Sequence, residues 1–158
     1  MEQRDAGAWY GKGSGLLALG KYLDAIECYN RALEINPRDA DAWLNKGDAL
    51  FALGKYIDAI ECYNRVLEIN PRNAGAWHNK GSALFALGKY LDAIECYNRA
   101  LEINPRDAGA WFDKAQLSCL LGDKHTAIES LKQAIALNKD FALKTKDSTC
   151  LKDLVNNV

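Results

Sequence analysis

The sequence of 158 residues has no long apolar run, no run of lysine or arginine, and no apolar stretch near its start. Its apolar segments are much shorter than the ~20 residues that a membrane-spanning helix needs. Acidic and basic residues are nearly balanced, 21 against 20, and are interspersed along the chain. We therefore expect neither nucleic acid nor an anionic membrane as a partner. The polar start is unlike a secretory signal peptide, and a cytoplasmic location is expected.

Motifs that would indicate catalysis or cofactor binding are also missing. There is no glycine-rich phosphate loop, no CxxC pair, and no set of cysteine and histidine at the spacing of metal ligands. His78 could act as a general base in principle, but a single histidine is more often a binding contact. We therefore predict that the protein is not an enzyme and that it uses no metal and no cofactor.

The cysteines fit a reducing compartment. Three of them share one position of a repeat, and adjacent copies should lie farther apart than the roughly 7 Å between Cα atoms that a disulfide allows. These three are Cys28, Cys62 and Cys96. Cys119 and Cys150 do not form a metal cluster with either histidine. The sequence thus predicts five free thiols.

What the sequence does contain is a period of 34 residues. It is marked by tryptophan, glycine and proline, at Trp9, Trp43, Trp77 and Trp111, at Gly20, Gly54, Gly88 and Gly122, and at Pro37, Pro71 and Pro105. A period of this length indicates helix pairs stacked along an array. It divides the chain into units one to four, followed by an expected C-terminal cap helix. The boundaries are 6–39, 40–73, 74–107 and 108–141 for the units and 142–158 for the cap.

Each unit carries start and stop signals for two helices. A short polar residue precedes the first helix, as Asp39 does in unit two, and a glycine such as Gly54 ends it. The second helix begins near Tyr56 and ends before Pro71, which cannot continue it. Four units therefore predict eight helices.

Two surface contacts are expected in every unit. A lysine one turn after the tryptophan should lay its alkyl stem over the indole, as Lys46 would over Trp43. On the second helix, Glu61 and Arg65 are four residues apart and should form an exposed ion pair. Neither contact requires a function.

Unit three, residues 74–107, resembles a tetratricopeptide repeat, a helix–turn–helix of the same length. It departs from that pattern at Lys80, where the family has leucine. The matching positions are Trp77, Gly81, Ala93, Ala100 and Pro105, with Leu84 and Tyr97 as conservative matches. The resemblance implies an all-α fold, a right-handed α-solenoid of stacked antiparallel helix pairs, formed by residues 1–158 as a single domain. It also implies a scaffold that binds proteins or peptides.

The units are nearly copies of one another, and most differences fall on the first helix, at repeat positions 2, 5, 6, 9 and 12. Four of these positions share one helix face. In the family this face, with position 6, lines the concave groove that holds peptides. The resemblance therefore implies that the packing residues, the copied frame, are the same in every unit, while the residues of the groove differ. Drift at exposed positions is the alternative. The predicted groove residues are Tyr10, Ser14, Leu17, Leu44, Asn45, Asp48, Phe51, His78, Asn79, Ser82, Phe85, Phe112, Asp113 and Gln116. Aromatic and aliphatic anchors among amides suit an extended or helical peptide.

One ligand class of the family can be compared with these residues. Members that clamp the C-terminal carboxylate of heat-shock chaperones combine asparagine with lysine and arginine at set positions. Asn45 and Asn79 match the asparagine at position 6, but no cationic position is matched, and Asp113 stands where arginine is required. A chaperone-tail receptor is therefore not expected, and the identity of the protein or peptide ligand stays open.

Two other interpretations remain. Near-identical units could stack end to end through the open face of unit one, which would make the chain a structural element with weak self-association. The array could also be engineered, recently duplicated, or part of a longer one, because Arg4 and Asp5 match the end of a preceding unit.

Overall fold

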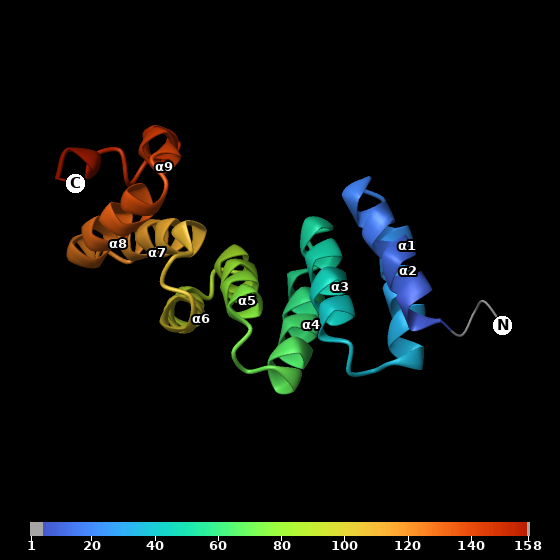
Figure 1. Ribbon diagram of the computed structural model, residues 1–158. Coiled ribbons are helices and arrows are strands. Elements are labelled where there is room, and N and C mark those ends of the chain that lie inside the picture. Colours follow the sequence, from blue (N-terminus) through green and yellow to red (C-terminus); the bar gives the residue numbers. More distant parts are fainter. Residues whose placement is uncertain (1–4, 158) are drawn as a thin grey trace.

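The computed structural model describes residues 5–157, and all regular secondary structure in this range is helical. Four helix pairs follow one another, with α1 at one end of the array and α8 near the other (Figure 1). The pairs are α1 (Ala6–Ala18) with α2 (Tyr22–Ile35), α3 (Ala40–Ala52) with α4 (Tyr56–Ile69), α5 (Ala74–Ala86) with α6 (Tyr90–Ile103), and α7 (Ala108–Leu120) with α8 (Lys124–Leu137). The eight expected helices and the all-α fold are confirmed.

Local chemistry sets the helix ends as the sequence indicates. Asp39 caps α3, because its Oδ1 accepts a hydrogen bond from the Ala42 N–H at 3.0 Å. The glycine after each first helix has φ between +73° and +83°, a left-handed conformation that costs glycine little. Side-chain caps of the same kind begin α5 and α7.

The two helices of a unit approach closely where a glycine faces a tyrosine ring. A Cβ atom built on Gly81 would lie 2.7 Å from Cε1 of Tyr97, well inside the 3.5–4.0 Å at which carbon atoms attract. The contact recurs in units one and two. In unit four the pair is replaced by Ala115 and Leu131, both fully buried. A larger residue on one helix is thus matched by a smaller one on the other.

Units stack because the second helix of each unit packs on the first helix of the next, as α2 on α3, α4 on α5, and α6 on α7. First helices of neighbouring units also contact one another. The first helices, which touch their neighbours, therefore form an inner layer and the second helices an outer one.

The C-terminal segment is not the single cap helix that was expected. It forms α9 (Asp140–Lys144) and two short 3₁₀ helices, η2 (Thr145–Asp147) and η3 (Val155–Asn157), joined by turns. Thr145 Oγ1 donates to the Ala142 carbonyl, and Ser148 Oγ accepts from the Leu151 N–H. Such local bonds compete with a continuous helix.

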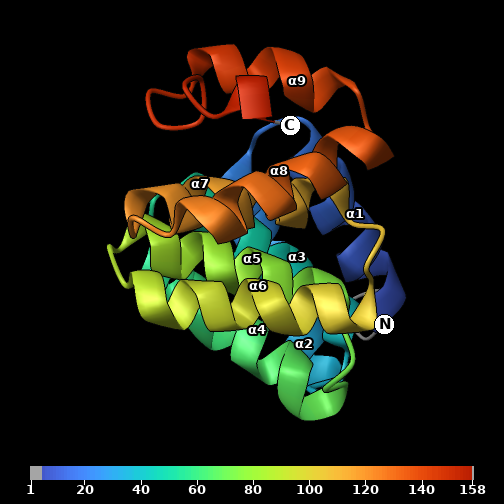
Figure 2. The same ribbon diagram turned by 90° about the vertical axis from the view of Figure 1, so that its left-hand side faces the viewer.

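The segment nevertheless covers the end of the array, where α9 lies across α8 (Figure 2). Phe141, Leu151 and Leu154 are buried in one cluster with the core of unit four. The apolar residues of the tail therefore cap unit four, as expected, but they do so from turns and short helices.

Cys119 and Cys150 are joined by a disulfide, with their Cα atoms 6.1 Å apart. The expectation of free thiols is wrong for this pair, because the fold-back of the C-terminal segment brings Cys150 to the end of α7. The other three, Cys28, Cys62 and Cys96, are free and buried.

The two expected surface contacts have different outcomes. Lys46 Nζ lies 5.2 Å from the centroid of the Trp43 ring, and the other units repeat this contact. Arg65, however, pairs with Glu68 at 3.4 Å rather than with Glu61. The carboxylate three residues later lies on the same exposed face, where either pair would contribute little to stability.

Candidate functional site

The groove residues all lie on the first helices α1, α3, α5 and α7, which form the inner layer. All but one are half-buried. The exception is Phe112, which is 8% exposed because the ring of Phe141 covers it at a centroid distance of 4.9 Å. The expectation that Phe112 faces a ligand is therefore wrong. No other unit is followed by such a tail, so the repeat pattern could not indicate this contact.

The aromatic groove residues pack against tyrosines of the second helices. The Phe51 ring lies 5.1 Å from that of Tyr56, and the Phe85 ring lies 5.5 Å from that of Tyr90. Since Phe51 and Phe85 stay half-buried, each ring keeps one part against the protein and another part open. They combine packing with an accessible apolar surface.

Polar contacts that were not expected from the sequence cross each junction between units. At every junction, the side chain at position 6 reaches back to the preceding unit, to position 5 or position 9. The three contacts are Asn45 Nδ2 donating to Tyr10 Oη at 3.1 Å, Asn79 Nδ2 donating to Asp48 Oδ1 at 2.9 Å, and Asp113 Oδ2 lying 2.7 Å from His78 Nε2.

These contacts explain part of the variation between units. An asparagine at position 6 meets a hydroxyl or a carboxylate, and the aspartate at position 6 meets a histidine. Comparing position 6 of one unit with positions 5 and 9 of the unit before it is the signal that could have revealed the pairing. The identities at these positions are therefore set partly by contacts between units.

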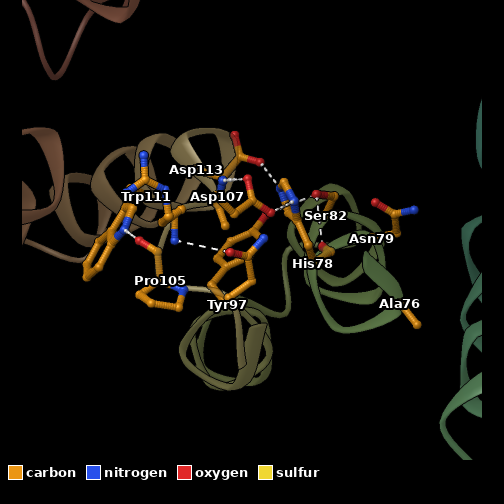
Figure 3. A network of polar contacts seen from close by, with 12 residues as sticks. Ala76, His78, Asn79, Ser82, Tyr97, Pro105, Asp107, Trp111 and Asp113 are labelled. Carbon is orange, nitrogen blue, oxygen red and sulfur yellow. Dashed lines mark hydrogen bonds and ion pairs between the residues drawn. The ribbon is translucent and has the colours of Figure 1, made fainter. Parts of the chain in front are cut away.

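His78 lies between two carboxylates (Figure 3). Its Nδ1 is 3.0 Å from Asp107 Oδ2, and its Nε2 is 2.7 Å from Asp113 Oδ2. Burial disfavours the charged imidazolium, but the hydrogen bonds to Asp107 and Asp113 and their negative charges outweigh it and raise the pKa of His78 to about 9. Asp107 was expected only as the cap of α7, and it performs both roles because its Oδ1 accepts from the Ala110 N–H.

Position 9 is bonded to a buried tyrosine in units one to three. Tyr63 Oη donates to Asp48 Oδ1 at 2.7 Å, and Tyr97 Oη donates to Ser82 Oγ at 3.4 Å. Burial raises the pKa of Asp48, while the hydrogen bonds from Tyr63 and Asn79 oppose that rise. The polar groove residues are thus largely held in place by the protein itself.

A cavity of about 130 Å³ opens where unit three meets unit four. It is lined by Ser82, Phe85, Tyr97, Asp113 and Gln116. Four of these are predicted groove residues, and Tyr97, from α6, was expected only as a packing residue. The cavity has the size of a single side chain and combines one phenylalanine ring, one carboxylate, two hydroxyls and an amide.

Larger cavities lie beside the tryptophans. Those around Trp43 and Trp77 measure about 360 and 340 Å³ and are lined by the same repeat positions in successive units. They therefore belong to the copied frame. Between residues 5 and 157, no group of three or more His, Cys, Asp or Glu side chains could hold a metal ion. No helix in this range is long and apolar enough to cross a membrane.

Family models of the tetratricopeptide repeat match residues 4–74, 74–107 and 96–129. Together they span residues 4–129. No curated protein is significantly similar to the chain in sequence.

Several solved structures are similar to the chain. The first TPR of Spaghetti (RPAP3), bound to the HSP90 peptide SRMEEVD, is 30% identical with a TM-score of 0.72, over 74% of this chain and 93% of that one. A thermophilic TPR protein of Thermus thermophilus is 28% identical with a TM-score of 0.75, over 87% and 78%. A crystal structure of MamA covers 99% of this chain and 88% of that one with a TM-score of 0.83, and its 22% identity supports the fold alone.

Proposed function

The chain belongs to the tetratricopeptide repeat family, and from this premise we propose that it is a protein-interaction scaffold that holds a segment of a partner against the groove residues. The segment binds as an extended or helical peptide along the inner layer of first helices. The protein acts by binding, without catalysis and without a cofactor.

The observation that carries this proposal is the open apolar surface of the inner layer. Phe51 and Phe85 present half-open rings on successive units. Beside them, the side-chain amide of Gln116 makes no hydrogen bond to any residue in the described part of the chain. Exposed apolar surface next to unused polar groups is typical of an interface.

The acidic peptide held by the similar RPAP3 domain is not the ligand class that we propose. No groove residue is lysine or arginine, and both ring nitrogens of His78 already contact Asp107 and Asp113, so a peptide carboxylate would find no free cationic partner. The two matching asparagines, Asn45 and Asn79, are already bonded to Tyr10 and Asp48. Binding an acidic tail would require breaking these bonds without a charge to replace them.

A pair of matched double variants tests the groove. Phe51→Ala with Phe85→Ala should abolish capture of partner proteins from a lysate of the source cells, while the far-UV helical signal is retained. Because both rings also pack on tyrosines, the melting temperature should fall by a few degrees, as for a loss of roughly 1–2 kcal/mol.

The control is Leu23→Ala with Leu91→Ala. These leucines are 66% and 75% exposed on the second helices α2 and α6. They are as apolar as the rings but lie outside the groove. Equal loss of capture in both double variants would contradict a groove site, and complete unfolding of the phenylalanine variant would make Phe51 and Phe85 packing residues.

A second candidate function is assembly through unit one. Ala42, Ala76 and Ala110 are fully buried against the preceding second helix, whereas the equivalent Ala8 is exposed. The described residues thus leave this face of α1 uncovered, and a second copy can cover it in a two-fold dimer. Such a contact is weak, because one helix face is small beside a standard interface of ~1,600 Å².

Sedimentation at rising concentration tests the assembly. We expect reversible association in the wild type and a monomer when Ala8→Glu places a charge on the uncovered face. A strict monomer in both proteins would leave the groove as the site of function.

A cytoplasmic location remains part of the proposal. In that reducing compartment the Cys119–Cys150 disulfide would be opened. Gel mobility of the protein from its source cells, with and without reductant, distinguishes the two states. A persistent disulfide would contradict a cytoplasmic location.

A further inference from the structure

The groove carries a net negative charge. Its charged residues are Asp48, Asp113 and His78, with no lysine or arginine among them. The imidazole of His78 lies between Asp113 and Asp107, so this cluster has one net negative charge with the proton and two without it. The groove is therefore negative in either state, although the whole chain has a net charge of only −1.

The cavity between units three and four makes part of this charge accessible. Asp113 contacts His78 through its Oδ2 (Figure 3). Its other carboxylate oxygen forms no hydrogen bond with any residue between 5 and 157. The side chain is 33% exposed and lines the cavity with the hydroxyls of Ser82 and Tyr97. Phe85 adds an aromatic wall and Gln116 an unused amide. The cavity thus offers acceptors and a ring but no cation.

The preceding junction differs in the position of its carboxylate. Between units two and three, Asp48 occupies position 9, and its Oδ1 accepts hydrogen bonds from both Tyr63 and Asn79. Between units three and four, Ser82 stands at position 9, and the carboxylate at position 6, Asp113, contacts His78 through its Oδ2. It is this carboxylate that lines the cavity.

We propose that this cavity binds a lysine or arginine side chain of the partner peptide. The cationic head lies at Asp113, with the Gln116 carbonyl as a second acceptor, and the alkyl stem lies against the Phe85 ring. Ammonium and guanidinium groups donate strongly to carboxylates and are attracted to aromatic faces. An acidic side chain here would meet the carboxylate of Asp113, and no residue that lines the cavity is a cation that could pair with it. The inference rests on the proposed function, because it names the side chain that the groove selects.

Selection from a phage library of random peptides tests the inference. The full chain and two variants, Asp113→Asn and Asp107→Asn, are each used as bait. We expect lysine and arginine to be enriched with the wild type and with Asp107→Asn, and the enrichment to disappear with Asp113→Asn. Both variants remove one carboxylate from His78, but Asp107 does not line the cavity. Asparagine can also cap α7, as Asn73 caps α5, so folding is preserved.

The affinity of one selected peptide provides a second measurement. Replacing its cationic residue by glutamine should weaken binding to the wild type at least ~10-fold, since a charge-assisted hydrogen bond is lost. The same replacement should change binding to Asp113→Asn by less than about twofold, which is within the scatter of such energies.

Each other outcome overturns the inference in a distinguishable way. Peptides without cationic bias that still depend on Phe51 and Phe85 would refute the cavity assignment and leave the proposed function standing. Equal loss of enrichment with both variants would assign the effect to the His78 contacts instead of the cavity. If no peptide is selected by the wild type, the proposed function fails with it.

Discussion

His78 is a titratable side chain with a raised pKa that joins unit three to unit four. It belongs to unit three, and both of its ring nitrogens face carboxylates, one at the start of α7 and one within it. Burial alone would lower its pKa, yet the hydrogen bonds and charges of Asp107 and Asp113 raise that pKa to about 9. At neutral pH the junction is therefore held by a protonated imidazole between two negative groups.

Replacing His78 by glutamine should destabilise the protein in a pH-dependent way. Because the folded pKa lies above the unfolded value of about 6.5, the contribution is complete below about pH 6.5 and is lost as the pH rises through about 9. The difference in unfolding free energy from the wild type should approach an upper limit of about 3 kcal/mol near pH 6 and shrink toward pH 9.5. Urea titrations between about pH 5 and 10 measure this difference.

The control is His125→Gln, which removes the exposed histidine of α8. This variant should follow the wild type at every pH. A constant difference between His78→Gln and the wild type would contradict the two-carboxylate arrangement.

Gly81 should not tolerate alanine. Its Cβ would lie 2.7 Å from the Tyr97 ring, and overpacking of this kind costs about 1–3 kcal/mol, more than the ~1 kcal/mol that alanine gains in a helix. Gly15→Ala is the matched control, since nothing lies within 4 Å of its Cβ position, and it should be stabilising. Thermal unfolding of both variants measures the effect.

Adding Tyr97→Leu to Gly81→Ala recreates the pair found in unit four and should recover part of the loss. If Gly81→Ala alone is as favourable as Gly15→Ala, the close approach of α5 and α6 does not limit the size of this residue.

At the scale of elements, prediction from the sequence succeeded where the signal is local. Asp39, Gly54 and Pro71 each act within about one helical turn, so helix ends could be read directly from the chain. Prediction failed where the environment of a residue depends on a contact that occurs in one unit only. Phe141 covers Phe112 only because the tail turns back.

The groove shows the same division. The sequence could predict that the proposed groove residues share a face of the first helices, since the repeat fixes which positions lie together. The partners of the polar groove residues could not be predicted, because Asp113 and His78 are 35 residues apart in sequence. A pairing across units becomes visible only when neighbouring units are compared in pairs.

The tail should depend on its disulfide. Cys150→Ser removes a link that closes a loop with a sequence separation of 31 residues, which stabilises by about 2–4 kcal/mol in the chain-entropy account. We expect hydrogen exchange to accelerate in the C-terminal segment from α9 onward and in α7, and to stay unchanged in α1 to α4. Reductant should lower the stability of the wild type by a similar amount and leave the variant unaffected. Equal protection with and without the link would show that Phe141 and Leu151 hold the tail by packing alone.

For the whole molecule, stability in an array is approximately a sum of unit and neighbour terms. The units here share a nearly identical frame, but each junction has its own polar pair. Removing one unit therefore has a different cost according to the junction that it creates. Two deletions of equal length separate the neighbour term from the number of units.

Deleting residues 40–73 places Asn79 next to Tyr10, which repeats the partner that Asn45 has in the full chain. Deleting residues 74–107 places Asp113 next to Asp48 and removes His78. Both products should fold and be less stable than the full chain. The second should be the weaker by roughly 1–3 kcal/mol, the cost of an unpaired buried polar group.

Urea unfolding of the two deletion proteins measures this difference. Adding Asp113→Asn to the second deletion restores asparagine at position 6 and should recover stability. Equal stabilities would mean that the polar pairs do not contribute, and an unfolded product would contradict the additive description.

The three free cysteines can report how often each of the first three units opens. Cys28, Cys62 and Cys96 occupy the same place in successive units and are buried, and burial raises the pKa of Cys62 and Cys96 to about 11 and that of Cys28 in the same direction. A thiol reagent can therefore modify each one only when its own unit opens. Timed modification followed by mass spectrometry would give the opening rate of units one, two and three separately, without an engineered label. Unit one, whose first helix buries only Gly13, should be modified first.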